Sequence, residues 1–407
     1  MDNVVEIDSC RLCHGKDIPI ILDFGRTALA ISLVKAEDLD KPEFTAPLRL
    51  VQCSECGCVQ LKDAVKPEIL FKDYVYISNT NPNLVAHFNQ YAKDVVAKIQ
   101  PSLSSRILGI GGNSADLEVA FKNLGFTDVF NVEPSTQAAK ISELNDIKTI
   151  NDFFNLSTAF GIQEQYGGFD IITSNNCVAH VLDLNSFFLG IKWLLNQTGV
   201  FIFENAYWKN VVEGLFLGQI YSEHIFGHTL KSLKKFLAQF ELEIFDVELN
   251  NQQNGSFRCY VQHLDGPQKS TGVLDSLIEA EEKAGLFNIE TYNNWKKEID
   301  KLKQELIDLL ERIKTTKIAI YSWPAKATTI ASYFEIGQYA KYVVEDSEYK
   351  VGRFTPQSHL PIKNRQYFIE NPPDYALIMA TNCVDQIIKN NPQYKGKWIV
   401  PMPFQVL

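Results

Sequence analysis

The stretch Arg106-Ile-Leu-Gly-Ile-Gly-Gly-Asn-Ser-Ala115 decides the fold of this chain. Residues 106–110 have the short apolar pattern of a buried strand, and a helix-prone segment follows. Gly111 and Gly112 lie at the strand-to-helix turn, where small residues let a ligand approach the backbone closely. The glycine pattern is incomplete, since Ser114 and Ala115 fill the later positions. The turn therefore predicts either a nucleotide-type site or a purely structural glycine turn.

The pattern of strand followed by helix continues outward from this turn. Further candidate strands are residues 129–133, 148–151, 169–173 and 200–204. Amphipathic stretches between them predict a parallel sheet with crossover helices, an α/β fold. Glu133 ends the second strand, 22 residues after Gly111, where a carboxylate can accept hydrogen bonds from both ribose hydroxyls. This arrangement fits a dinucleotide or S-adenosylmethionine, and Phe153 could stack on the adenine.

Composition narrows the classes of protein. The 407 residues predict two or three domains, at roughly 100–200 residues each. A net charge of -10 argues against a general nucleic-acid binder, although a local basic pocket for a diphosphate remains possible. No apolar run approaches the ~20 residues of a membrane span, and MDNVVEIDSC lacks the basic start and apolar core of a signal peptide. We therefore expect a cytoplasmic protein without membrane or nucleic-acid partners.

Two CxxC pairs stand in the N-terminal segment. Cys10 and Cys13 form one pair, and Cys53 and Cys56 form the other. In a reducing compartment, paired cysteines predict a metal more often than a disulfide. Four thiolates complete a tetrahedral shell and leave no open position, so we expect a structural zinc ion. Cys58 is a spare that could compete for the fourth position, and redox chemistry is the lesser alternative.

The second half of the chain contains a charged connector and another strand–helix series. Residues 276–314 have apolar positions at helical spacing and predict an amphipathic packing helix. The later candidate strands are residues 317–321, 342–345, 375–379 and 398–401. We expect four divisions: a zinc-binding segment (1–85), a central α/β domain (86–265), a helical connector (266–314) and a smaller Rossmann-like domain (315–407).

Polar residues follow the candidate strands at their carboxyl ends. One run is Ser174 to Leu184, which includes His180. A second is Tyr221-Ser-Glu-His224, which a proton-transfer site could use. Histidine can accept a proton at neutral pH, and a tyrosine hydroxyl can stabilise an enolate. From spacing alone, an ordinary helix with a solvated polar face is the plainer interpretation.

Matching stretches extend along nearly the whole chain. They are Cys10–Cys13; Cys53–Cys56 with Val59-Gln60-Leu61; Tyr74-Val-Tyr76; Val132-Glu133-Pro134; Asn175–His180; Tyr221–His224; Gly255-Ser-Phe-Arg258; Pro324-Ala-Lys326; Gly352–Pro356; and His359–Ile362. In this order they resemble the sugar C-methyltransferase family of deoxysugar pathways. The resemblance implies a zinc-binding segment, a central Rossmann-like methyltransferase domain and a C-terminal Rossmann-like domain.

The resemblance also implies an activity. Family members methylate C3 of a thymidine-diphosphate-linked 4-keto-6-deoxy sugar, using S-adenosylmethionine and an enolate. The implied catalytic residues are His224 as the base, Tyr221 near the keto oxygen, and Glu223 and His180 in support. The implied donor-binding residues are Gly109, Gly111, Gly112, Asn113, Glu133, Pro134, Phe153 and Asn175. The implied substrate-binding residues are Tyr76, Asn176, Tyr207, Ser256, Arg258, Lys326, Arg353 and His359.

Four departures from the family pattern affect these expectations. The family has an acidic residue, which contacts the donor, where this chain has Gly109, and it has Ser-Asn-Asp-Gly where this chain has Gly112-Asn-Ser-Ala115. Gln253-Asn-Gly-Ser256 replaces the usual His-Gly-Gly-Ser, and Trp323 in the last glycine loop argues against a second dinucleotide site. The departures leave two alternatives open: enolisation of a sugar nucleotide without methyl transfer, and a non-catalytic subunit. A NAD-dependent dehydrogenase is disfavoured by the incomplete glycine pattern.

Overall fold

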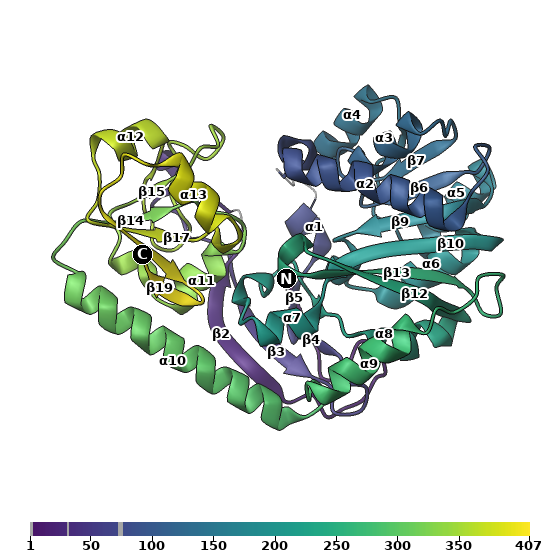
Figure 1. Ribbon diagram of the computed structural model, residues 1–407, viewed down its shortest axis with the longest axis horizontal. Coiled ribbons are helices and arrows are strands. Elements are labelled where there is room, and N and C mark those ends of the chain that lie inside the picture. The colour runs from purple at the N-terminus through teal and green to yellow at the C-terminus, as the bar shows by residue number, and fades with distance from the viewer. Residues whose placement is uncertain (1–2, 31, 72–75) are drawn as a thin grey trace.

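The computed structural model describes residues 3–30, 32–71 and 76–407, and Tyr74 of the matching stretches lies outside these ranges. The described chain forms three sheets of four strands or more and one two-stranded pair (Figure 1). The largest sheet lies at one end of the molecule and the C-terminal sheet at the other, with the N-terminal strands between them and helix α10 along the lower edge beneath the C-terminal sheet (Figure 1). Among the described helices, none is long and apolar enough to cross a membrane.

The largest sheet has seven strands in the order β12-β13-β10-β9-β6-β7-β8. Six of them run in the same direction, and β13, which lies between β12 and β10, runs antiparallel to both of its neighbours. The strands are β6 (Ile107–Ile110), β7 (Val129–Val132), β8 (Lys148–Ile150), β9 (Phe169–Asn175), β10 (Leu195–Ala206), β12 (Leu242–Asn250) and β13 (Ser256–His263). The predicted parallel sheet is confirmed, and each predicted strand overlaps an observed one.

Helices cover both faces of this sheet because its strands are apolar on both sides. Ile107 packs with the helices of one face and Leu108 with those of the other, as the two-residue period of a strand requires. The first face holds α2 (Pro82–Ile99) and α3 (Asp116–Asn123). The second holds α5 (Leu156–Tyr166), α6 (Leu184–Leu194) and α8 (Leu230–Leu237). Helix α4 (Thr136–Leu144) connects β7 to β8.

Strand order reverses beside β6, and this reversal positions the site. The chain goes from β6 to β7 and β8 on one side, then returns to β9 on the other. The connections therefore leave β6 and β9 in opposite directions and open a crevice at their carboxyl ends. The turn after β6 and the polar run after β9 both lie at this crevice.

The N-terminal strands form a smaller antiparallel sheet in the order β11-β4-β3-β2. Its strands are β2 (Ile20–Ala28), β3 (Thr45–Gln52), β4 (Val59–Leu61) and β11 (Phe226–Gly227), beside the pair β1 (Val4–Glu6) and β5 (Asp63–Val65) and the short helix α1 (Pro67–Phe71). Because β11 follows the polar run at Tyr221–His224, its pairing with β4 fixes that run against the N-terminal sheet.

The predicted single connector helix is wrong in one respect, because the segment forms two helices. They are α9 (Val273–Lys283) and α10 (Ile289–Ile313). Gly285 adopts a left-handed φ of 71°, and the Asn288 side chain caps the new helix by accepting from the Glu290 backbone N–H. The buried stripe of α10 includes Trp295 and Ile299, as the spacing predicts.

The C-terminal sheet has the order β16-β15-β14-β17-β18-β19, parallel except for the last strand. Its strands are β14 (Ile318–Tyr321), β15 (Tyr342–Val344), β16 (Ile362–Lys363), β17 (Tyr375–Ile378), β18 (Lys397–Pro401) and β19 (Phe404–Val406). Its helices are α11 (Ala327–Tyr333), α12 (Arg365–Glu370) and α13 (Val384–Asn390). One hydrophobic core joins this sheet to α10, to β2 and β3, and to α7 (Trp208–Glu213), so the N-terminal and C-terminal parts pack as one body.

Candidate active site and zinc centre

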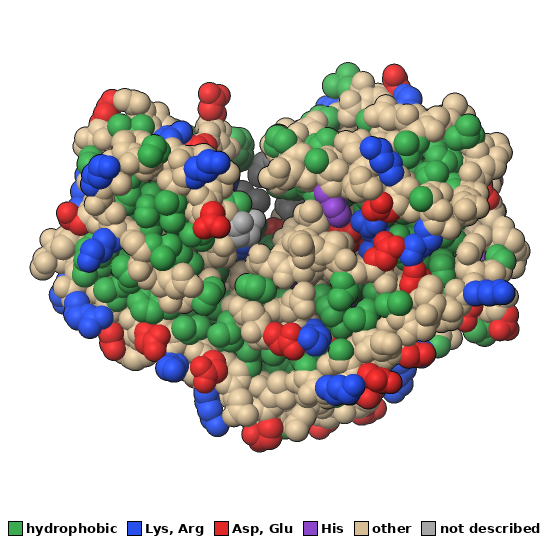
Figure 2. All heavy atoms as spheres, in the orientation of Figure 1, with side chains coloured by type: hydrophobic (Ala, Val, Ile, Leu, Met, Phe, Trp, Pro, Cys, Tyr) green, Lys and Arg blue, Asp and Glu red, His purple; other side chains and the backbone are tan. Residues whose placement is uncertain are grey.

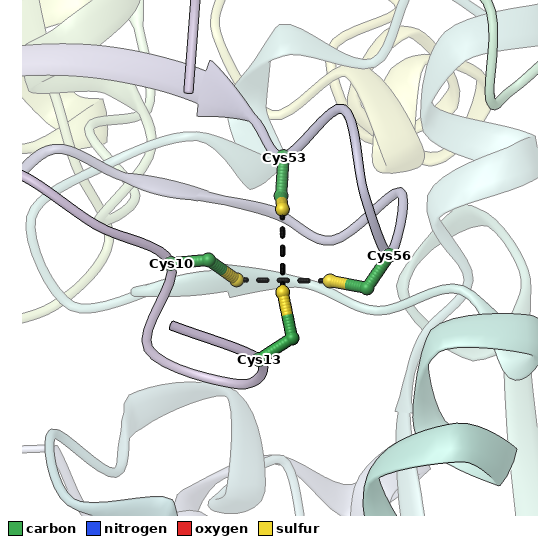
Figure 3. Close-up of side chains that lie close together, drawn as sticks. All are labelled: Cys10, Cys13, Cys53 and Cys56. Carbon is green, nitrogen blue, oxygen red and sulfur yellow. Dashed lines mark hydrogen bonds between the residues drawn. The ribbon is translucent and has the colours of Figure 1, made fainter. Parts of the chain in front are cut away.

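The four predicted metal ligands meet in space. Cys10 Sγ lies 3.6 Å from Cys56 Sγ, and Cys13 Sγ lies 3.5 Å from Cys53 Sγ. All four sulfurs lie within 4.8 Å of one another and point to a common centre (Figure 3). A tetrahedral zinc with Zn–S bonds of about 2.3 Å needs sulfurs about 3.8 Å apart, so the donor set fits zinc. Cys58 is not part of this group, although it is also buried.

Two similar backbone turns hold the cysteines. In the first, the Cys10 N–H donates to the Gly15 carbonyl at 2.8 Å; in the second, the Cys53 N–H donates to the Cys58 carbonyl at 2.9 Å. Gln60 Nε2 donates to Cys10 Sγ at 3.0 Å. Donors to the sulfur stabilise the thiolate form that binds a metal. No ligand position is left for a substrate, so the zinc is structural.

A cavity of about 1470 Å³ lies at the carboxyl ends of β6, β7 and β9. Figure 2 shows the surface hollowed between the part that carries the large sheet and the part that carries the C-terminal sheet. The cavity exceeds the roughly 300–1,000 Å³ of a typical single-ligand pocket, so it has room for two ligands side by side. Its described lining includes Gly111, Gly112, Asn113, Glu133, Pro134, Phe153, Asn175, Asn176, His180, Tyr221, His224, Tyr76 and Lys326.

The glycine turn and Glu133 form one side of the cavity. Gly111 has a φ of 66°, and a Cβ there would lie 2.7 Å from Cys177 Sγ, so only glycine fits. Glu133 accepts backbone hydrogen bonds from Asn113 at 2.9 Å and Ser135 at 2.8 Å. Each carboxylate oxygen keeps a lone pair for a ribose hydroxyl. Burial raises the pKa of Glu133, as expected for a carboxyl group removed from bulk water.

Residues 76–80 are tied to the same turn. Asn113 Nδ2 donates to the Tyr76 carbonyl at 2.9 Å, and the Ser78 N–H donates to Asn113 Oδ1 at 2.9 Å. The Ser78 hydroxyl donates to Asp116 at the start of α3. Asn113 and Ser114 depart from the family pattern, and in this chain both bond to this segment. Tyr76 is thereby held at the cavity wall.

The polar runs after β9 and before β11 form the other side of the cavity. The Tyr221 hydroxyl lies 3.0 Å from His224 Nε2, and His224 Nδ1 lies 2.8 Å from the Gln219 carbonyl. The His180 ring centre lies 4.8 Å from that of His224, and His180 Nε2 has no partner among the described residues. Burial lowers the pKa of His224 to about 4 and that of His180 well below its usual value. Both rings are therefore neutral at neutral pH.

Seven predicted site residues do not line the cavity among the described residues: Gly109, Glu223, Tyr207, Ser256, Arg258, Arg353 and His359. Arg258 donates to Glu204 at 3.0 Å and stacks 3.5 Å above Tyr91, within the sheet's interior. His359 Nε2 lies 2.8 Å from Glu43 Oε1.

The other five differ in their surroundings. Tyr207 is buried edge-on against Phe257, and the Ser256 hydroxyl donates to the Gln252 carbonyl. The Arg353 guanidinium lies 4.2 Å from the centre of the Tyr349 ring. Glu223 is buried near Tyr221, whose pKa its charge helps to raise. Gly109 has no side chain to offer. These seven residues do not line the cavity in the described part of the chain, and their contact with a ligand stays a prediction.

Glu118 is a cavity residue that sequence reasoning missed. It lies in the first turn of α3, is 1% exposed and lines the cavity beside Gly112. Nothing in its local sequence distinguishes it from other acidic residues in the first turn of a helix.

Three family models match the chain in order. "Putative zinc binding domain" matches residues 10–71, "Methyltransferase domain" matches 85–247, and "C-methyltransferase C-terminal domain" matches 251–403. A curated relative, "C-methyltransferase NovU" of Streptomyces niveus, is 24% identical over 409 residues, which are 99% of this chain and 97% of that protein. The fold, the cavity and the cysteine cluster thus define an S-adenosylmethionine-dependent methyltransferase with a structural zinc ion.

Solved structures are similar over part of the chain. A methyltransferase of Clostridium acetobutylicum is 13% identical, with a TM-score of 0.37 over 44% of this chain and 92% of that one. The magnesium protoporphyrin IX methyltransferase of Synechocystis, solved with S-adenosylhomocysteine, is 15% identical, with a TM-score of 0.33 over 44% and 84%. These partial likenesses are too weak to carry an argument. The ordered family matches and the full-length relative do carry one: they support the sugar C-methyltransferase family that the sequence resembles.

Proposed function

We propose that the chain transfers a methyl group from S-adenosylmethionine to C3 of a nucleotide-diphosphate-linked 4-keto-6-deoxy sugar, with thymidine diphosphate as the nucleotide and the cytoplasm as the location. One observation carries the proposal. The Tyr221–His224 pair lines the same cavity as the Gly111 turn and Glu133. A proton acceptor and a nucleotide-type site therefore face one space, as methylation of an acidic carbon requires.

The hydrogen bonds of His224 assign its tautomer. The Gln219 carbonyl can only accept, so Nδ1 carries the proton. Nε2 then has the free lone pair and accepts from the Tyr221 hydroxyl. When a keto sugar enters, the hydroxyl can turn to the keto oxygen and leave Nε2 open toward C3. The pair thus offers an acceptor for the C3 proton and a donor for the developing enolate.

Burial makes these two roles interdependent. The low pKa of His224 keeps the ring neutral and able to act as a base at neutral pH. The same burial opposes formation of an isolated imidazolium. Because the enolate and the imidazolium form together, each stabilises the other in a medium of low dielectric constant. His180, with its unpartnered Nε2, is placed to bond a sugar hydroxyl.

On the donor side, Glu133 would hold the ribose, Phe153 would contact the adenine, and the Gly111 turn would lie under the methionine portion. S-adenosylmethionine supplies an electrophilic methyl group when bound. On the acceptor side, Tyr76, Asn176 and Lys326 line the cavity. The Lys326 chain packs on Gly218 of the other part of the molecule, which brings a cation to the space where a diphosphate would lie.

The test uses the zinc-loaded chain, S-adenosylmethionine and thymidine-diphosphate-linked 4-keto-6-deoxyglucose. Mass spectrometry should show the gain of one methyl group, and NMR should place it at C3. His224→Gln should lower kcat by about 10²–10⁴-fold, because a positioned base contributes that much. Its affinity for S-adenosylhomocysteine should not change, since the imidazole lies on the acceptor side.

The matched control is His359→Gln, which changes a histidine outside the cavity and should turn over as the wild type does. Absence of product from a chain that binds the donor would refute the proposed acceptor. Deuterium exchange at C3 without any methylated product would instead favour enolisation as the activity.

A further inference from the structure

Glu118 is a buried carboxyl group whose second oxygen has no partner. It is 1% exposed, and the Thr173 hydroxyl donates to its Oε1 at 3.5 Å. Oε2 is buried without a hydrogen-bond partner among the described residues. No ion pair within the described residues includes Glu118. A buried carboxylate without a cation or donor is costly, so such groups are found mainly where a ligand completes them.

The carboxyl group occupies space that two glycines leave empty. A Cβ at Gly109 would lie 1.8 Å from Glu118 Oε1, and a Cβ at Gly112 would lie 2.9 Å from Oε2. Gly109 is the position at which the resembled family has an acidic residue. In this chain the acidic group reaches the same place from α3, nine positions later in the sequence. A side chain at position 109 would therefore require the Glu118 side chain to move from its present place.

The charges around Glu118 indicate which ligand it needs. Asp116 and Glu133 both oppose its ionisation, and burial raises the pKa of Glu118 to about 8. A positively charged hydrogen-bond donor is therefore what the site lacks. S-adenosylmethionine carries two cations, but its sulfonium has no N–H, whereas its α-ammonium has three.

We propose that Glu118 binds the α-ammonium group of S-adenosylmethionine through Oε2, in place of the acidic residue that Gly109 has lost. The inference rests on methyl-donor binding in this cavity and is independent of which sugar accepts the methyl group. It explains why the glycine turn remains a donor site although its sequence departs from the family pattern.

The experiment compares two ligands by calorimetry on the zinc-loaded chain. S-adenosylhomocysteine keeps the ammonium group, and 5′-deoxy-5′-methylthioadenosine lacks the whole amino-acid portion. Glu118→Gln preserves the shape of the side chain. It should lower the affinity for S-adenosylhomocysteine by about 10–100-fold, the usual effect of losing a charged hydrogen bond. The same variant should bind 5′-deoxy-5′-methylthioadenosine as the wild type does.

The matched control is Glu281→Gln, which changes a buried carboxyl group on α9 outside the cavity. It should leave the ratio of the two affinities unchanged. A second test moves the carboxyl group from position 118 to position 109. The double variant Gly109→Asp with Glu118→Ala should restore the preference for S-adenosylhomocysteine over 5′-deoxy-5′-methylthioadenosine. The single variant Gly109→Asp should not bind S-adenosylhomocysteine, because the two side chains collide. A folded double variant that binds both ligands alike would contradict the equivalence of the two positions.

Equal affinity of wild type and Glu118→Gln for S-adenosylhomocysteine would overturn the inference and leave the proposed function intact. An equal loss of affinity for both ligands in Glu118→Gln would also overturn the inference, because that result indicates a change in pocket shape. Failure of the wild type to bind S-adenosylhomocysteine would overturn both. Normal binding with no sugar methylation would count only against the proposed acceptor.

Discussion

Acid should destabilise this protein partly through His228, and His228→Leu should remove that part. His228 is 4% exposed and stacks on Phe226, with ring centres 5.6 Å apart. Its Nε2 has no partner among the described residues. Burial lowers the pKa of His228 to about 3, and the nearby His224 adds to the effect. The ring therefore remains neutral in the folded chain at neutral and mildly acidic pH.

The magnitude follows from the difference in proton binding. In the unfolded chain His228 titrates at its ordinary value of 6.5, whereas in the folded chain it titrates at about 3. As the pH falls through this window, the unfolded chain gains a proton that the folded chain does not, so the free energy of unfolding decreases. Between about pH 7 and about pH 5 the loss for one such histidine is about 2 kcal/mol.

Urea unfolding at the two pH values measures the effect as a difference between proteins. Glu118 and Glu281, whose pKa values burial raises to about 8 and about 6, act with the opposite sign. Both glutamates are present in the wild type and in His228→Leu, so their contributions to the pH dependence cancel when the two proteins are compared. The wild type should lose about 2 kcal/mol more than His228→Leu between about pH 7 and about pH 5. Phe226→Leu, which disturbs the same ring stack without a titrating group, should lose as much as the wild type. Parallel pH dependences for the wild type and His228→Leu would refute the reasoning.

Two further predictions concern the zinc centre and the interior of the large sheet. Cys13→Ala should abolish bound zinc in metal analysis and lower the unfolding midpoint, because zinc binding is coupled to folding. The control is Cys58→Ala, which changes a cysteine outside the ligand group. This variant should keep one zinc ion per chain. Arg258→Ala should lower the free energy of unfolding by about 3–5 kcal/mol in urea, because it leaves the buried Glu204 without its cation. A loss below about 1 kcal/mol would show that His87, 2.7 Å from Glu204, already compensates that charge.

Much of the fold could be predicted because its signals are local. The strand at residues 106–110, the glycine turn after it and the CxxC pairs are each contained within a few residues. A buried parallel strand needs only a short apolar run, and a zinc knuckle needs only two cysteines on one tight turn. The resemblance to one family then supplied the order of the domains and the Tyr221–His224 pair.

The partners of individual polar side chains could not be predicted, because they come from distant parts of the sequence. The family resemblance assigns Arg258 and His359 to substrate binding. In the folded chain, Glu204 lies beside Arg258 and Glu43 lies beside His359. Close packing gives each buried polar group one set of neighbours, and no local period encodes those neighbours.

The sequence by itself determined the class of fold, the metal ligands and the segments that carry the chemistry, since each depends on spacing along one element. Only the tertiary structure decided which side chains share the cavity. Gly109 looks like a lost donor contact in the sequence, whereas in the folded chain its missing side chain makes room for Glu118. That exchange depends on how closely α3 packs on β6, a distance across the fold that no pattern within either element can set.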